Sequence, residues 1–266
     1  MTSSGQVFAA ARAENRAAFV GYLPAGFPSY AGAVEGLRAL VDGGVDLIEL
    51  GLPYSDPVID GPTIQAATER ALRGGTRVAD VLRTVEATVA MGVPVVVMTY
   101  WNPVLAYGVE RFAADLKAAG GSGLITPDLI PDEAGDWLDV ADRHDLDRIF
   151  LVAPSSTAAR IASTVEACRG WVYAASTMGV TGAREATSAA APGLVDRVRA
   201  ATQLPVGVGL GVSNRRQAAE VASYADGVIV GSALVRCLLD APDEKAGAKA
   251  VGTLARELAA GVRDGR

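Results

Sequence analysis

The chain has 266 residues, of which 50% are hydrophobic, 20% charged and 6% aromatic, a composition typical of a globular protein with a large core. Its net charge of −6 argues against a nucleic-acid partner, because surfaces that bind a phosphate backbone are basic. No run of about 18 apolar residues occurs, and charged residues interrupt the N-terminal segment, so neither membrane spanning nor export is expected.

Short apolar segments alternate with helix-like segments along the whole chain. This alternation predicts βαβ units with a parallel sheet, and eight repeats in this length favour a closed (β/α)₈ TIM barrel over an open, doubly wound sheet. One α/β domain spanning residues 1–266 is therefore predicted. The expected strands are Phe19–Leu23, Val45–Leu50, Val93–Thr99, Gly123–Thr126, Arg148–Ala153, Trp171–Ser176, Val206–Leu210 and Gly227–Val230.

Turn and cap residues mark the expected helices. An N-terminal helix at about Gln6–Arg12 precedes the first strand, where it can close the floor of the barrel. The second strand is followed by two helical patterns instead of one, Pro62–Arg73 and Val78–Met91, with a glycine pair between them. Further helices are expected after Ser29, over Pro131–Arg143, between Thr157 and Cys168, and over Glu244–Val262.

The scarce residue types limit the possible chemistry. The single histidine, His144, lies in a polar segment that fits a solvated helix end, so a metal site built from histidines is excluded by number. The only lysines, at positions 117, 245 and 249, lie in segments that resemble surface helices, where no Schiff base is expected. Cys168 and Cys237 lack metal-ligand spacing and are expected to be small buried thiols in a reducing compartment, which favours the cytoplasm. Acid–base chemistry must therefore fall to carboxylates, tyrosines or bound water.

Two carboxylates are brought together by the second strand and the loop after it. Because side chains alternate along a strand, Glu49 points the same way as the apolar Val45 and Leu47, although burying an unpaired carboxylate is costly. The loop then reaches Asp60, just before the helix that begins at Pro62. Glu49 could instead be a buried partner of an arginine, and Asp60 could merely cap that helix. The strand-end position favours catalysis for Glu49, because catalytic groups of such barrels lie there.

Other candidates follow the remaining strands at the same end of the barrel. The residues collected there are Tyr22, Tyr100, Asp128 and Tyr173. The long polar loop 177–185 after the sixth strand has glycine hinges and is expected to act as a lid, unless it is an ordinary surface loop.

Glycine-rich turns after the seventh and eighth strands predict a phosphate site. Gly209 and Gly211 follow the seventh strand, and Gly231 and Ser232 lead from the eighth strand into a helix. Glycines allow backbone N–H groups to approach a ligand, and a helix N-terminus adds partial positive charge, so a phosphate can be bound without a lysine. In the alternative interpretation the glycines only turn the chain and Ser232 only caps the helix.

Six motifs in order make the chain closely resemble the tryptophan synthase alpha subunit family over nearly its whole length. They are IELGLPYSDPVIDGPTIQ at 48–65, MTYWNPVLAYG at 98–108, PDLIPDEA at 127–134, STMGVTGARE at 176–185, GVGLGVS at 207–213 and GVIVGSALV at 227–235. The resemblance implies a lyase of tryptophan biosynthesis that cleaves indole-3-glycerol phosphate to indole and glyceraldehyde 3-phosphate. It also implies an α2β2 complex whose beta subunit joins indole to serine with pyridoxal phosphate, so that no cofactor and no metal are expected in this chain.

The resemblance also assigns roles to individual residues. Glu49 would protonate C3 of the indole ring and take the proton from the hydroxyl on the adjacent side-chain carbon, and Asp60 would bind the indole N–H. A raised pKa is expected for Glu49 at its apolar strand end, and an unraised pKa for Asp60 on a wetter loop. The implied phosphate-binding residues are Gly182, Gly211, Gly231 and Ser232. The implied substrate-binding residues are Tyr22, Tyr100, Tyr173 and Thr181. The implied partner interface comprises Pro53, Tyr54, Ser55, Asp56, Pro57, Asn102 and Asp128.

Two other functions remain open on sequence alone. One is a free-standing lyase with the same residues that releases indole without a beta subunit. The other is a non-catalytic barrel that binds and activates a partner, although such a module would need neither Glu49 nor Asp60.

Overall fold

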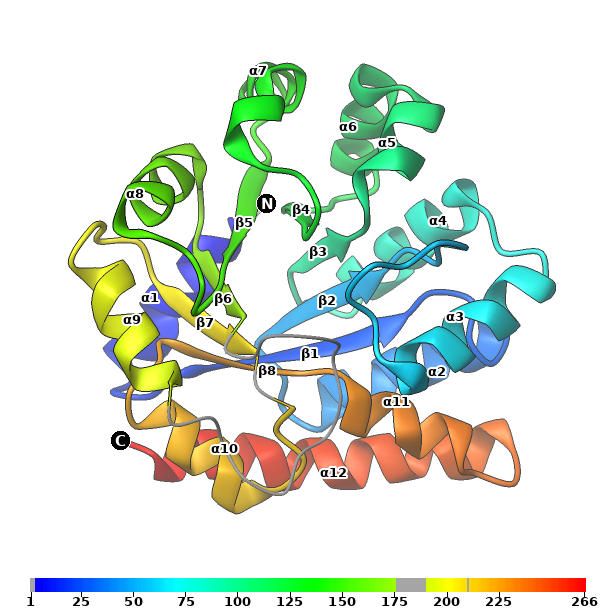
Figure 1. The fold of residues 1–266 in the computed structure, drawn as a ribbon. Coiled ribbons are helices and arrows are strands. Elements are labelled where there is room, and N and C mark those ends of the chain that lie inside the picture. Colours follow the sequence, from blue (N-terminus) through cyan, green and yellow to red (C-terminus); the bar gives the residue numbers. More distant parts are fainter. Residues whose placement is uncertain (1–2, 176–189, 210) are drawn as a thin grey trace.

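Eight parallel strands close into a barrel in the computed structural model of the chain, which describes residues 3–175, 190–209 and 211–266 (Figure 1). Each strand pairs with the next one in the sequence, and β8 (Gly227–Val230) pairs with β1 (Ala18–Pro24) to complete the circle. Helices surround the strands on the outside (Figure 1). The predicted (β/α)₈ barrel is confirmed.

The other strands are β2 (Leu47–Gly51), β3 (Val95–Met98), β4 (Gly123–Thr126), β5 (Asp147–Val152), β6 (Val172–Ala175) and β7 (Val206–Gly209). The helices are α1 (Ser4–Ala13), α2 (Tyr30–Asp42), α3 (Pro62–Arg73), α4 (Val78–Val89), α5 (Trp101–Tyr107), α6 (Val109–Ala118), the 3₁₀ helix η1 (Pro131–Glu133), α7 (Gly135–Arg143), α8 (Ala158–Ala167), α9 (Ala191–Arg199), α10 (Arg215–Ala222), α11 (Ser232–Leu239) and α12 (Glu244–Asp264).

Several boundaries differ from those expected. The second strand begins at Leu47, because the N–H of Val45 bonds to the carbonyl of Leu40 at the end of α2 and not to a neighbouring strand. The helix expected over 131–143 is divided into η1 and α7 at Ala134, whose dihedrals of φ −91° and ψ 7° are not helical. The two helices after β2 are confirmed, but β3 is also followed by two, which Gly108 separates at φ 95°.

Inward-facing side chains fill the barrel in layers. Below the site, Val20, Leu47 and Val96 belong to one buried cluster with residues of α1. Within that cluster the ring of Phe8 lies 5.2 Å from the ring of Trp171. Helix α1 therefore closes the floor of the barrel, and the opposite end remains for a site.

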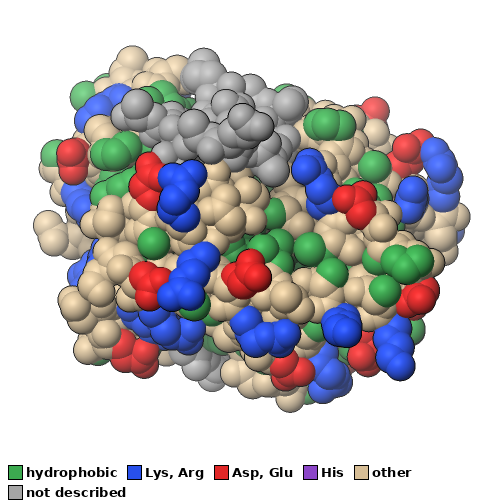
Figure 2. All heavy atoms as spheres, turned by 90° about the horizontal axis from the view of Figure 1, so that it is seen from below, with side chains coloured by type: hydrophobic (Ala, Val, Ile, Leu, Met, Phe, Trp, Pro, Cys, Tyr) green, Lys and Arg blue, Asp and Glu red, His purple; other side chains and the backbone are tan. Residues whose placement is uncertain are grey.

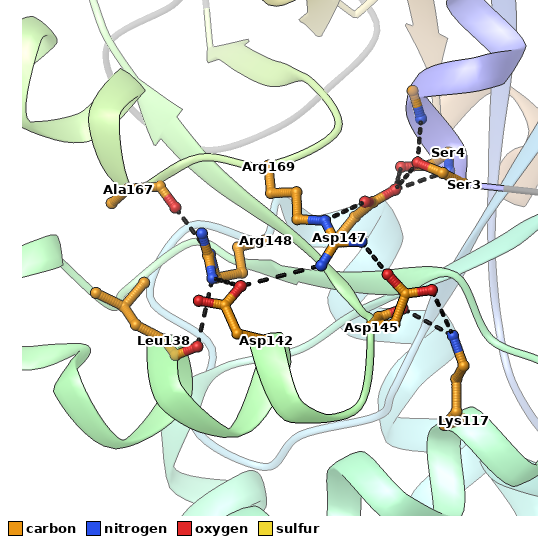
Figure 3. A network of polar contacts seen from close by, with 11 residues as sticks. Ser3, Ser4, Lys117, Leu138, Asp142, Asp145, Asp147, Arg148, Ala167 and Arg169 are labelled. Carbon is orange, nitrogen blue, oxygen red and sulfur yellow. Dashed lines mark hydrogen bonds and ion pairs between the residues drawn. The ribbon is translucent and has the colours of Figure 1, made fainter.

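The position of α1 is fixed by Asp147, the first residue of β5 (Figure 3). Its carboxylate is 1% exposed and accepts hydrogen bonds from the Ser3 hydroxyl at 2.8 Å, the Ser4 N–H at 2.8 Å and the Ser4 hydroxyl at 2.6 Å. The guanidinium of Arg169 lies 3.6 Å away. Ser3 also caps α1, so one buried acid satisfies both the cap and the start of the helix.

The outer surface carries charges of both signs. On the face over α10 and α12, basic and acidic side chains are interspersed with scattered hydrophobic ones (Figure 2). His144 ends α7 with its Nε2 atom 2.6 Å from the carboxylate of Glu110, in agreement with the expected helix end. Both cysteines are free thiols; Cys168 is buried, as expected, whereas Cys237 is only partly so. Within the described residues, no helix is long and apolar enough to cross a membrane, and no cluster of side chains fits a metal ion.

Candidate active site

Glu49 lies inside the barrel at the carboxyl end of β2. It pairs in register with Tyr22 of β1 and lies two residues beyond Leu47, so its side chain shares the inner face with the core cluster. The residue is 1% exposed, and its Oε2 atom has no hydrogen-bond partner among the described residues. Burial, together with the charge of Asp60, raises the pKa of Glu49 to about 8. In the described part of the chain no arginine pairs with it, so the alternative of a structural ion pair is not supported.

Asp60 lies in the loop between β2 and α3, close enough for its charge to act on Glu49. The cap residue of α3 is Gly61, so Asp60 does not serve as the helix cap. Burial raises the pKa of Asp60, and a hydrogen bond from Tyr100 opposes that rise. The expectation of an unraised pKa on a wetter loop was therefore wrong, because the loop holds this carboxylate half-buried rather than in solvent.

Three tyrosines surround the two acids. Burial raises the pKa of Tyr22 and of Tyr173 well above the ordinary value, and the charges of both carboxylates add to each rise. Burial also raises the pKa of Tyr100, to about 12. All three hydroxyls therefore stay protonated at neutral pH, and the structure brings the predicted aromatic residues together with both predicted acids.

Glycines make room for these rings. A Cβ at Gly51 would lie 2.3 Å from the hydroxyl of Tyr22, and one at Gly209 would lie 2.6 Å from the hydroxyl of Tyr173. A Cβ at Gly231 would lie less tightly against Tyr22, 3.4 Å from an atom of its ring. Gly51 was not predicted as a site residue, although a glycine two residues after a buried acid at a strand end was a usable signal.

The predicted phosphate-binding residues Gly211, Gly231 and Ser232 follow the ends of β7 and β8. Gly211 has φ 69°, which favours glycine, and Ser232 is the first residue of α11. Gly231 occupies the cap position without any side-chain hydrogen bond, so Ser232 does not cap the helix. Within the part of the chain that the structure describes, no side chain caps the first N–H groups of α11, and a helix N-terminus of this kind attracts an anion.

Gln217 supports the loop that contains Gly211 and was missed by the sequence analysis. Its Oε1 atom accepts hydrogen bonds from the N–H of Ser213 at 2.9 Å and from the Ser213 hydroxyl at 3.0 Å. Gln217 is 2% exposed in the first turn of α10, where Asn214 provides the cap. A glutamine that follows a glycine-rich turn at this spacing was the available signal.

Two predicted site residues, Thr181 and Gly182, lie outside the described residues together with the expected lid 177–185. Their roles stay predictions.

The expected partner interface is partly exposed. Pro53 is buried within the chain, Tyr54 and Pro57 are half-buried, and Ser55 and Asp56 are exposed. Asn102 is exposed and donates a hydrogen bond to the hydroxyl of Tyr54 at 3.2 Å. Asp128 is exposed as well, and its carboxylate oxygens accept from the N–H of Trp101 at 2.9 and 3.1 Å, which caps α5.

Large exposed hydrophobic residues accompany these positions and were not among the predicted interface residues. Val58 is 71% exposed, Leu105 51% and Ile130 41%, and they follow β2, β3 and β4 respectively. Three such residues on adjacent connections at one end of the barrel are typical of a surface that another protein covers.

Comparisons with known proteins agree over the whole chain. The family model described as "Tryptophan synthase alpha chain" matches residues 8–263. The tryptophan synthase alpha chain of Salinispora arenicola is 64% identical over 263 residues, covering 99% of this chain and 98% of the relative. A solved structure of Mycobacterium tuberculosis tryptophan synthase superimposes with a TM-score of 0.93 at 62% identity, covering 99% of both chains. The tryptophan synthase subunit alpha of Legionella pneumophila gives a TM-score of 0.87 at 32% identity, covering 98% of this chain and 99% of that one.

Proposed function

The chain belongs to the tryptophan synthase alpha chain family, and we propose that Glu49 and Asp60 perform the alpha reaction of that family in it. This reaction cleaves indole-3-glycerol phosphate to indole and glyceraldehyde 3-phosphate. The observation that carries the assignment is a fully buried Glu49, whose Oε2 atom has no hydrogen-bond partner among the described residues, with a pKa of about 8 beside a second carboxylate.

The two acids have different roles: Glu49 makes both proton transfers, and Asp60 stabilises charge. At neutral pH Glu49 holds a proton, which it donates to C3 of the indole ring. Asp60 is an anion that accepts a hydrogen bond from the indole N–H and stabilises the positive charge that forms on the ring. The Glu49 carboxylate then takes the proton of the hydroxyl on the adjacent side-chain carbon. As that carbonyl forms, the carbon–carbon bond breaks and its electron pair restores the indole ring. Glu49 ends protonated, so no external acid or base is consumed.

Backbone groups bind the other end of the substrate. The phosphate lies against the N-terminus of α11 at Gly231 and Ser232 and against the loop containing Gly211, where N–H groups and the helix dipole oppose its charge. Tyr22 and Tyr173 line the pocket between the phosphate and the two acids. Pairing an apolar, tyrosine-lined pocket with an anion site matches an aromatic substrate that carries a phosphate.

A beta subunit covers the face that carries Val58, Leu105 and Ile130, in an α2β2 complex. Pyridoxal phosphate belongs to that subunit: all three lysines of this chain lie on α6 and α12, outside the barrel, where none can reach the site. The free thiols and the biosynthetic reaction favour the cytoplasm.

The test is release of glyceraldehyde 3-phosphate from indole-3-glycerol phosphate, measured for the chain alone and with a beta subunit. Glu49→Gln and Asp60→Asn should each lower kcat by at least about 100-fold, because each removes a group that acts in the transition state. Glu35→Gln, which changes an exposed glutamate of α2, is the matched control and should leave turnover unchanged. Full turnover in Glu49→Gln would refute the assignment.

A further inference from the structure

The loop that carries Asp60 is held by a hydrogen bond to a residue that follows another strand, β3. Between β2 and α3 the chain has no helix or strand, so the position of Asp60 depends on contacts made by its loop. The hydroxyl of Tyr100, 41 residues away in sequence, accepts a hydrogen bond from the N–H of Ile59 at 3.0 Å. The same hydroxyl donates to the carboxylate of Asp60.

Tyr100 is itself held rigidly. It is 5% exposed and occupies the cap position of α5, with φ −68° and ψ 159°. Its ring packs against the ring of Tyr54 with centroids 5.3 Å apart. The next N–H in the chain, that of Trp101, is bound by Asp128. The hydroxyl therefore presents a fixed point to a loop that has no regular structure of its own.

One hydroxyl group meets two requirements at once. As an acceptor it orders the backbone at Ile59, and as a donor it favours the ionised form of Asp60, which the half-buried position alone disfavours. A phenylalanine of the same shape would keep the ring contact with Tyr54 and lose both hydrogen bonds.

We propose that Tyr100 is a positioning residue of the alpha reaction, whose hydroxyl fastens the catalytic loop at Ile59 and holds Asp60 in place as an anion. This inference rests on the proposed roles of Glu49 and Asp60. It gives Tyr100 a function through Asp60, beyond lining the substrate pocket.

The experiment compares Tyr100→Phe with the wild-type chain, each in complex with a beta subunit, by the pH dependence of glyceraldehyde 3-phosphate release. We expect kcat/KM at pH 7 to fall about tenfold, the typical cost of a lost hydrogen bond to a charged group. The acidic limb of the profile should move to higher pH, because Asp60 loses the donor that opposes its raised pKa. The alkaline limb, set by Glu49, should stay in place.

Tyr107→Phe is the matched control, since it removes a hydroxyl that donates to Asp115 at 2.6 Å on the outer surface. Its profile should equal that of the wild type. A decrease in Tyr100→Phe that is equal at every pH would overturn the proposal, because a purely structural defect lowers the amount of competent enzyme without moving a limb. An inactive wild-type complex would instead refute the proposed function, so the two failures are distinguishable.

Discussion

Replacing Glu49 with glutamine should make the protein more stable while abolishing its reaction. The pKa of Glu49 is about 8 in the folded chain and 4.5 for an ordinary glutamate. A carboxyl whose pKa rises on folding supports the fold fully below pH 4.5, and that support is lost progressively as the pH rises through 8. Glutamine has a similar shape and does not ionise, so the variant lacks this loss.

The size of the effect follows from the two pKa values. Each pH unit between them changes the free energy of unfolding by about 1.4 kcal/mol. The advantage of Glu49→Gln over the wild type should therefore grow by about 3 kcal/mol from pH 4.5 to pH 7, and reach about 5 kcal/mol above pH 8. The amide can also lose or gain a hydrogen bond relative to the acid, but that contribution is the same at every pH.

Urea unfolding of both chains at several pH values between 5 and 9 measures this difference. The informative quantity is how the difference in free energy of unfolding, Glu49→Gln minus wild type, changes with pH. This difference should increase up to about pH 8 and stay constant beyond. The exposed Glu35→Gln serves again as the control for replacing a glutamate by glutamine at the surface. A difference in free energy of unfolding between Glu49→Gln and the wild type that is constant at all pH values would show that Glu49 is ionised in the folded chain. Glu49 could then not act as the proton donor of the mechanism.

Three further substitutions test the floor, the phosphate site and the partner surface. Asp147→Ala leaves the groups of Ser4 without their buried acceptor and should lower the free energy of unfolding by about 3 kcal/mol, with faster amide hydrogen exchange in α1; normal exchange there would contradict the anchoring role. Ser232→Asp places a carboxylate at the start of α11, where it favours the helix but repels the substrate phosphate. The KM should rise at least about tenfold with no loss in Tm, and an unchanged KM would place the phosphate elsewhere. Leu105→Ser should weaken binding of a beta subunit about tenfold in a calorimetric titration while leaving the isolated chain folded, and undiminished affinity would exclude that surface.

The periodicity of the sequence was sufficient to predict the barrel but not the residues at which its strands and helices begin and end. Runs such as the one in β3 are apolar on both faces, as strands between a filled barrel and a ring of helices must be. The end of a strand depends on which N–H finds a partner in the neighbouring strand. Val45 is apolar like its neighbours, yet it bonds back to α2, and nothing in its side chain predicts that choice. The division into two helices after β3 depends on Gly108, and nothing in the sequence distinguishes this glycine from the others.

The site residues were predictable where position along a strand decides the environment. Glu49 follows an alternating inward pattern, so its burial and raised pKa could be anticipated. Asp60 could not be assessed in this way, because its burial depends on how a loop folds over the barrel. Gln217 bonds to Ser213 four residues earlier, so its role had a local signal in the sequence. Gly51 leaves space for Tyr22 on the neighbouring strand, a contact that exists only once the strands are assembled.

The interaction between the two acids sets the pH range of the reaction and can be measured separately from it. The mechanism needs Glu49 protonated and Asp60 ionised, so the working range lies between the two pKa values. The negative charge of Asp60 itself raises the pKa of Glu49, after the larger contribution from burial, and thereby extends the range upward. Removing that charge with Asp60→Asn should lower the pKa of Glu49. In the Asp60→Asn background, the stability advantage gained by adding Glu49→Gln should therefore stop growing at a lower pH than in the wild-type background. Because this cycle measures unfolding, it does not depend on the low turnover expected of Asp60→Asn, and an unchanged end point would mean that the two carboxylates do not interact.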